Sequence, residues 1–183
     1  MVVVIDTRRQ RFEALAGEVA APVLRYARRR TDAHTADDVL AETLLVAWRR
    51  FDEIPIDAAL PWCYAVAHNC LANLTRGARR QRQLAARVAA LDPPQTVERA
   101  PDSRDPELQE ALARLRAEDR EILQLWVWEE LTPGEIAAVL GLNTNAVHVR
   151  LHRARNRLAA LLGKDGRGAG QKRDDREVFD DRS

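Results

Sequence analysis

One face of the segment 144–162 gathers side chains that can bind DNA bases and phosphates. A helical period predicts a helix here, with an apolar stripe formed by Val147, Leu151, Ala154 and Leu158. The opposite face carries amide, imidazole and guanidinium groups, which donate hydrogen bonds to base edges and phosphates. Val149 stands in the middle of this polar face, where it is unfavourable in water but fits against a thymine methyl group. The candidate DNA-contacting residues are Asn145, His148, Val149, Arg150, His152 and Arg153.

A shorter helix and a tight turn are predicted directly before this segment. Thr132 is expected to cap a helix that begins at Pro133 and ends near Leu140. Gly141 is a typical helix stop, and Asn143 can cap the following helix. Helix, glycine turn and longer helix together predict a helix-turn-helix that places its second helix in the major groove. The alternative is an ordinary amphipathic helix with one stray apolar residue.

A second set of chemically suggestive residues lies on a long helix expected from about Leu60 to Arg82. Its buried side is predicted to hold Leu60, Cys63, Tyr64, Ala67, Cys70, Leu71, Leu74 and Ala78. An aromatic ring, two amides and two arginines occupy the opposite side, a combination that suits an opened single strand with unstacked bases. The alternative is that the tryptophan of this face packs under the loop 52–61. The candidate residues are Trp62, Asn69, Asn73, Arg76 and Arg80.

A third surface is expected on a helix over residues 36–51, with Thr35 as its cap. An exposed leucine among charged residues on one side of this helix is typical of a protein-docking edge. The alternative is a mixed-charge face that is simply solvated. The candidate docking residues are Asp38, Glu42, Leu45 and Arg49.

Composition narrows the class of protein. Of 183 residues, 46% are apolar and 31% are charged, and no apolar run approaches the length of a membrane span. The opening MVVVI is too short for a signal-peptide core, so we expect a cytoplasmic protein without membrane insertion. Cys63 and Cys70 form no CxxC pair, and no cysteine or third histidine lies near His148 and His152. We therefore expect no metal and no cofactor.

Two arginine clusters stand out because the chain is almost neutral, with a net charge of +1. Neither cluster contains an acidic residue, which suggests two separate contacts with polyanions. The alternative is that each cluster is simply a solvated helix face. The clusters are Arg76, Arg79, Arg80 and Arg82, and then Arg150, Arg153, Arg155 and Arg157.

The chain is predicted to be all-α, with two small helical domains joined by a flexible linker. Residues 8–85 form the first domain and 107–162 the second, with further helices expected over 8–30, 107–116 and 118–130. The intervening 86–106 holds four of the eight prolines, which favours a linker. Residues 163–183 are glycine-rich and charged, and we expect them to be disordered.

Three segments, taken in order, resemble a bacterial RNA polymerase sigma factor of the extracytoplasmic-function group. ADDVLAETLLVAW is similar to the family's polymerase-clamp-binding segment. LPWCYAVAHNCLANLTRGARR is similar to the segment that melts and reads the −10 element. LTPGEIAAVLGLNTNAVHVRLHRARNRL is similar to the −35 reader. The expected fold is thus a sigma region 2 helical bundle followed by a sigma region 4 helix-turn-helix.

The resemblance implies partners and roles. Core RNA polymerase would bind the Asp38 and Glu42 face, and promoter DNA would be contacted as duplex at −35 and as melted strand at −10. Trp62 and Asn69 match positions at the melted −10 region. Members with only these two domains often pair with an anti-sigma protein, which we take as a hypothesis for this chain.

The sequence also departs from the family pattern. Ala41 and Leu44 replace the usual glutamine and phenylalanine of the clamp-binding segment, which puts the details of that contact in doubt. Ala146, His148 and Val149 replace the commoner threonine, basic residue and serine. The −35 sequence that this chain reads therefore cannot be taken from the family.

Two other classes of protein compete with this interpretation. A stand-alone helix-turn-helix regulator would bind duplex DNA without polymerase, but it leaves the face around Trp62 unexplained. An enzyme is disfavoured because the sequence shows no glycine-rich phosphate loop, no nucleophile–base pairing and no site for a small-molecule substrate. Glu135 fits the helix-turn-helix framework better than it fits a general base.

Overall fold

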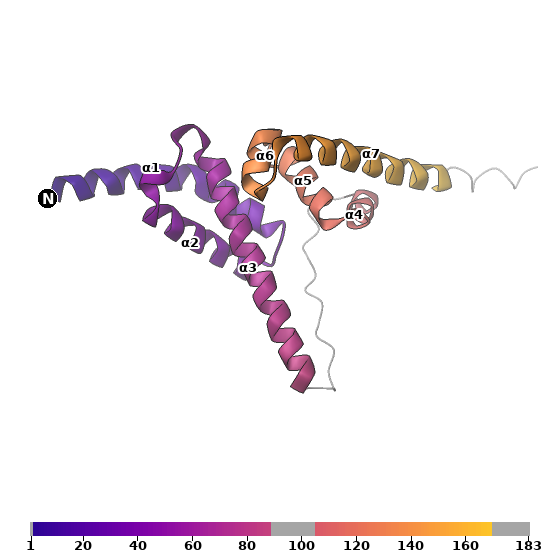
Figure 1. Ribbon diagram of the computed structural model, residues 1–183, viewed down its shortest axis with the longest axis horizontal. Coiled ribbons are helices and arrows are strands. Elements are labelled where there is room, and N and C mark those ends of the chain that lie inside the picture. Colours follow the sequence, from indigo (N-terminus) through magenta and orange to yellow (C-terminus); the bar gives the residue numbers. More distant parts are fainter. Residues whose placement is uncertain (1, 89–104, 170–183) are drawn as a thin grey trace, which may run out of the picture.

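The computed structural model describes residues 2–88 and 105–169, and within these ranges the side chains of 7–77 and 105–163. Every regular element in these ranges is helical (Figure 1). The first unit consists of α1 (Val2–Arg28), α2 (Ala33–Arg49), the 3₁₀ turns η1 (Phe51–Glu53) and η2 (Ile56–Ala58), and α3 (Ala59–Val88). The second consists of α4 (Pro106–Ala113), α5 (Ala117–Val127), α6 (Pro133–Leu140) and α7 (Thr144–Ala169).

The first unit is a three-helix bundle in which each helix contacts the other two. Apolar residues at helical spacing turn inward from all three helices, and Val23, Val39 and Cys63 are fully or almost fully buried. Burial of such side chains is the main force that holds helices together. Tyr26 and Tyr64 pack against each other in the same core, with ring centroids 5.2 Å apart. The bundle thereby fixes the orientation of α2 and α3.

The second unit builds its core where α5, α6 and α7 meet. Ile122, Ile136 and Val147 supply one fully buried side chain from each of these helices. The predicted stripe of α7 is confirmed, because Val147, Leu151 and Ala154 are buried and Leu158 is half-buried. Packing of this stripe leaves the opposite face of α7 outside the core.

Capping residues and a glycine at the turn, all recognisable in the sequence, specify the helix-turn-helix. Thr132 and Glu135 form a capping box at the start of α6, in which the Thr132 hydroxyl accepts from the Glu135 backbone N–H. Gly141 ends the helix in the left-handed conformation, with φ of 63°. Asn143 accepts from the backbone N–H of Asn145 at 2.8 Å. These three predicted features are confirmed.

The two units contact each other in this structure. Helix α6 of the second unit lies against α3 of the first, as Figure 1 shows. Buried residues of both units join one continuous apolar cluster at this place. The contact brings the helix-turn-helix directly beside α3.

Some predicted details differ from the structure. The cap of α2 is Asp32 and not Thr35, because the Asp32 carboxylate accepts from the Thr35 backbone N–H and hydroxyl, which also lowers the pKa of Asp32 to about 2. Leu74 was expected on the buried side of its helix but is 46% exposed, at the edge of a cleft between the units. The third helix continues to Val88, into the segment expected to be a linker, and the last continues to Ala169. The rest of the expected linker 86–106 and tail 163–183, namely residues 89–104 and 170–183, lies outside the described residues.

Candidate nucleic-acid interface

The exposed face of α7 presents the side chains that the helical wheel singled out. Asn145, His148, His152 and Arg153 are exposed on it. Val149 is 50% exposed although it is apolar. Val147 and Leu151, two positions before and after it, are buried on the other side of the helix and keep it on this outer face. An exposed valine among polar groups forms a surface that combines hydrogen bonding with one apolar contact.

Arginines surround a hollow beside this face. Arg116, Arg153 and Arg157 line a cavity of about 530 Å³ together with Glu118, Asp119 and Arg150. Arg150 is half-buried and donates to Glu118 at 2.8 Å, so part of its charge is compensated in the free chain. Arginine groups around such a hollow can hold phosphate oxygens through charge-assisted hydrogen bonds. The contribution of Arg116, at the start of α5, was not anticipated from the sequence.

Arg155 is positioned by a contact that sequence reasoning missed. Its guanidinium lies over the ring of Trp126 on α5, 4.8 Å from the ring centroid. Such cation–π pairs restrict the orientation of the charged group. The contact with Trp126 therefore restricts the orientation of the Arg155 side chain at the edge of the α7 face.

The polar side of α3 is exposed along part of its length. Asn69, Asn73 and Arg76 are exposed, and Arg76 donates to the Asn73 amide oxygen at 2.7 Å. The side chain of Arg80 lies outside the described side chains, and its position stays a prediction.

Trp62 is less exposed than the helical wheel predicts. It is half-buried and packs against the core of the first unit. The guanidinium of Arg50 lies 5.6 Å from the Trp62 ring centroid and also binds Glu53 at 2.6 Å. The ring is thus partly covered by Arg50, which precedes the loop 52–61, while packing of the ring under the loop itself stays a prediction. Part of its surface remains open to a partner.

The third surface lies on α2. Asp38, Glu42 and Arg49 are exposed there, and Leu45 is 40% exposed between them. Ala41 is exposed on the same helix. This surface faces away from the core residues Val39 and Ala47 and is available to a protein partner.

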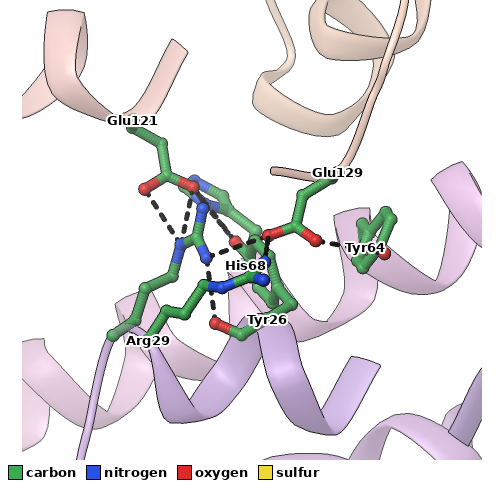
Figure 2. A network of polar contacts seen from close by, with 7 residues as sticks. Tyr26, Arg29, Tyr64, His68, Glu121 and Glu129 are labelled. Carbon is green, nitrogen blue, oxygen red and sulfur yellow. Dashed lines mark hydrogen bonds and ion pairs between the residues drawn. The ribbon is translucent and has the colours of Figure 1, made fainter. Parts of the chain in front are cut away.

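Polar residues of both units meet in a network that the sequence did not reveal (Figure 2). Arg30 follows α1, and its Nε donates to both carboxylate oxygens of Glu121 on α5, at 3.0 and 3.1 Å. Arg29 donates to Glu129 at 3.1 Å. Only 8% of the Arg30 side chain and 3% of the Glu129 side chain are exposed. Burial is the largest single effect and lowers the Arg30 pKa, but the interactions with Glu121, Tyr26 and Glu129 together outweigh it and raise the Arg30 pKa.

Two tyrosines and a histidine complete the network. The hydroxyl of Tyr26 donates to Glu121 at 3.2 Å, and that of Tyr64 donates to Glu129 at 3.3 Å. Burial raises the pKa of both tyrosines. His68 Nδ1 lies 3.4 Å from Tyr26 Oη, and burial lowers the pKa of His68. In the sequence, the one indication of this network is the run of arginines 28–30 at the end of α1. Basic residues also stabilise a helix C-terminus without any partner, so the run alone does not predict the network.

Other kinds of site have little support among the described residues. Their side chains include no group of three or more His, Cys, Asp or Glu residues placed to hold a metal ion. None of the described helices is both long enough and apolar enough to span a bilayer. Burial raises the pKa of the Cys63 thiol to about 11, which leaves it unreactive.

Comparison with known proteins identifies the family. The model of "Sigma-70, region 4" matches residues 106–158, which include the helix-turn-helix. The ECF RNA polymerase sigma factor SigL of Mycobacterium tuberculosis is 35% identical over 164 residues, covering 85% of this chain and 90% of SigL. The sigma factor CnrH of Cupriavidus metallidurans is 32% identical, covering 70% of this chain and 74% of CnrH. The chain belongs to the extracytoplasmic-function (ECF) family of RNA polymerase sigma factors.

Solved structures agree with this fold. The sigma factor RpoE of Bartonella quintana, in complex with the anti-sigma factor NepR, has a TM-score of 0.66 at 23% identity, covering 85% of this chain and 99% of RpoE. CnrH in complex with the cytosolic domain of CnrY has a TM-score of 0.58 at 28% identity, covering 86% of this chain and 90% of CnrH. The all-α, two-domain architecture predicted from the sequence is confirmed.

Proposed function

We propose that this sigma factor is a non-catalytic, cytoplasmic specificity subunit that binds core RNA polymerase and directs it to promoters through three separate surfaces. The observation that carries the proposal is the exposed face of α7, where Val149 stands 50% exposed among amide, imidazole and guanidinium groups. This face sits on a helix-turn-helix whose capping box and glycine turn fix its orientation.

The −35 element is read by α7 in the major groove. Asn145, His148, His152 and Arg153 reach base edges and phosphates, and Val149 contacts a thymine methyl group. Arg150 exchanges its pair with Glu118 for a phosphate when DNA approaches. Arg116 extends the phosphate contact beyond α7, because it lines the same hollow as Arg153.

The −10 element is captured as a melted strand by α3. Asn69 and Asn73 offer amide groups to unstacked bases, and Arg76 and Arg80 follow the backbone. Trp62 offers the open part of its ring as a wedge or stacking surface. Opening costs a few kcal/mol per unstacked step, and capture of the bases offsets part of this cost.

Core RNA polymerase is bound through α2. Leu45 supplies an apolar contact, and the surrounding Asp38, Glu42 and Arg49 supply charge complementarity. Binding to polymerase makes the second DNA contact effectively intramolecular once the first has formed. Neither DNA contact therefore needs high affinity alone.

An anti-sigma protein is proposed as a further partner. Two relatives of known structure, RpoE and CnrH, are described in complex with NepR and with the cytosolic domain of CnrY. A pull-down of this chain from its native cells should therefore yield a small protein in addition to polymerase. Recovery of polymerase alone would contradict this part of the proposal.

The −10 assignment is tested by separating DNA binding from DNA opening. Asn69→Ala should reduce permanganate reactivity of −10 thymines in a reconstituted holoenzyme at least fivefold, because it removes a group that holds an unstacked base. Binding of the holoenzyme to the same closed promoter at low temperature should change less than twofold. Gln10→Ala removes an exposed amide on a different helix, α1, and serves as the matched control. Equal losses in opening and in binding would contradict the assignment.

A further inference from the structure

The contact between the two units depends on ions that are buried only while the units are together. Arg29 and Arg30 belong to the first unit, and Glu121 and Glu129 belong to the second. None of the four charges has its partner within its own unit in these pairs. The pairs therefore act on the arrangement of the units and not on the fold of either one.

Additional hydrogen bonds surround these ion pairs and favour the arrangement in which α6 lies against α3, which we call the closed arrangement. Arg30 Nε donates to both carboxylate oxygens of Glu121, and Arg30 Nη1 donates to the backbone carbonyl of Tyr26 at 2.9 Å. The hydroxyls of Tyr26 and Tyr64 donate to Glu121 and Glu129. Figure 2 shows these side chains converging from α1, α3 and the second unit onto one point. Buried ion pairs are stable when such additional hydrogen bonds complete them.

Apolar packing between the units is incomplete beside this cluster. A cleft of about 990 Å³ lies next to Arg30 and Glu121, with Leu71, Ile122 and Leu142 among its lining residues. Leu74 is 46% exposed at the same cleft. The ion pairs therefore add a specific polar contact beside the apolar contact between α3 and α6. When the units separate, both members of each pair regain water, so closure is reversible.

The closed arrangement conflicts with simultaneous contact at two promoter elements. Positions −35 and −10 lie about 25 base steps apart, which is about 85 Å of B-form DNA at about 3.4 Å per step. In the closed chain α6 lies against α3, and α7 starts directly after α6. The 26 residues of α7 extend only about 39 Å at about 1.5 Å per residue. The two DNA-contacting faces therefore cannot reach both elements until the units move apart.

We propose that Arg29, Arg30, Glu121 and Glu129 form a latch that keeps the free chain closed and that must open before both promoter elements are engaged. This inference rests on the proposed function for its biological meaning, but the latch itself is a property of the free chain. The latch lies near the start of α2, the helix that carries the proposed polymerase-docking surface, because Arg30 precedes the Asp32 cap of α2 by two residues.

The latch is tested by measuring the distance between the units in the full-length chain. Spin labels are placed at Ala14→Cys on α1 and Ala113→Cys on α4, two exposed positions, in a chain that also carries Cys70→Ala. Double electron–electron resonance then reports the distribution of distances. The otherwise native chain should give one narrow distribution of distances. The double variant Glu121→Gln, Glu129→Gln should increase the fraction of longer distances at least fivefold.

The control has the same change in net charge. Glu110→Gln with Glu130→Gln neutralises two exposed carboxylates of the second unit and should leave the distribution unchanged. Circular dichroism checks helicity, and Glu121→Gln alone replaces the double variant if that variant loses helical signal. A broad, long distribution in the native chain would overturn the proposal, as would a closed distribution in the latch variant.

A separate arm adds core RNA polymerase to the labelled native chain. The proposal expects the distance distribution to shift to the longer range on addition of polymerase. A bound chain that remains closed would overturn the role of the latch in promoter engagement. Failure of polymerase to bind at all would contradict the proposed function, while the distances in the free chain would still decide whether the latch exists.

Discussion

At the scale of single residues, the exposed side of α7 combines hydrogen-bonding groups with one apolar side chain. Val149 is held outward because Val147 and Leu151 are buried on the other side of the helix. Its exposed side chain offers an apolar contact among polar neighbours, which fits a thymine methyl group. His68 is the opposite case, a polar group that is partly withdrawn from water between the two units.

The role of Val149 predicts a specific dependence on thymine methyl groups. Val149→Ala should weaken holoenzyme binding to a −35 element about fivefold, because it removes about 1 kcal/mol of apolar contact. Replacing the contacted thymine by deoxyuridine should weaken the native protein similarly and the variant hardly at all. Competition binding with each −35 thymine replaced in turn measures this coupling.

A second exposed valine supplies the control for this experiment. Val127 is 55% exposed on α5, and Val127→Ala should leave the thymine dependence unchanged. An undiminished deoxyuridine effect in Val149→Ala at every position would refute the methyl contact.

The lowered pKa of His68 predicts a pH dependence of stability. Burial, together with the nearby Arg30, lowers this pKa, while Glu121 opposes the shift. Because the folded chain favours the neutral ring, the stability from His68 is present above pH 6.5 and is lost as pH falls through the lowered pKa. The urea midpoint of the native chain should therefore fall more between about pH 7.5 and about pH 5.5 than that of His68→Gln. Equal falls would show that the ring does not contribute.

At the scale of elements, helix α6 connects the contact between the two units with the helix-turn-helix. It packs against α3 on one side and carries the turn to α7 on the other. Its capping box and the left-handed Gly141 therefore determine both the orientation of the recognition helix and the contact between units.

Loss of the α6 cap should have a measurable effect on stability. Thr132→Ala removes the hydroxyl that accepts from Glu135 and should lower the free energy of unfolding by about 1 kcal/mol. Thr75→Ala is the matched control, because that exposed hydroxyl only donates back to the Leu71 carbonyl. Urea denaturation of both variants measures the difference. A Thr132 variant as stable as the control would mean that tertiary packing alone holds the start of α6.

Much of the element level could be predicted from the sequence because its signals are local. Periodicity located the helices, and Thr132, Gly141 and Asn143 marked the turn. Two residues near the start of α2 can each act as its N-cap, and Asp32 does so rather than Thr35, because the Thr35 hydroxyl donates to the Asp32 carboxylate. Leu74 and Trp62 differed from the wheel because their surroundings come from other elements, a cleft and Arg50 respectively.

At the scale of the whole molecule, the decisive contacts join residues far apart in sequence. Arg30 and Glu121 are separated by 91 positions and Tyr64 and Glu129 by 65, so no local pattern could pair them. The sequence nevertheless indicated three surfaces on three helices, and all three are at least partly exposed in the structure. Under the proposed function, simultaneous use of both DNA-contacting surfaces requires the two units to change their relative position, so the proposal makes the interface between them part of the function.

The most direct test of the central claim is run-off transcription with purified core RNA polymerase on genomic promoter fragments, with and without this protein. The account predicts discrete transcripts that depend on the protein, whose aligned start sites share a −35 and a −10 element. Absence of such transcripts, combined with tight binding of promoter duplexes by the protein alone, would contradict the account and indicate a stand-alone DNA-binding regulator.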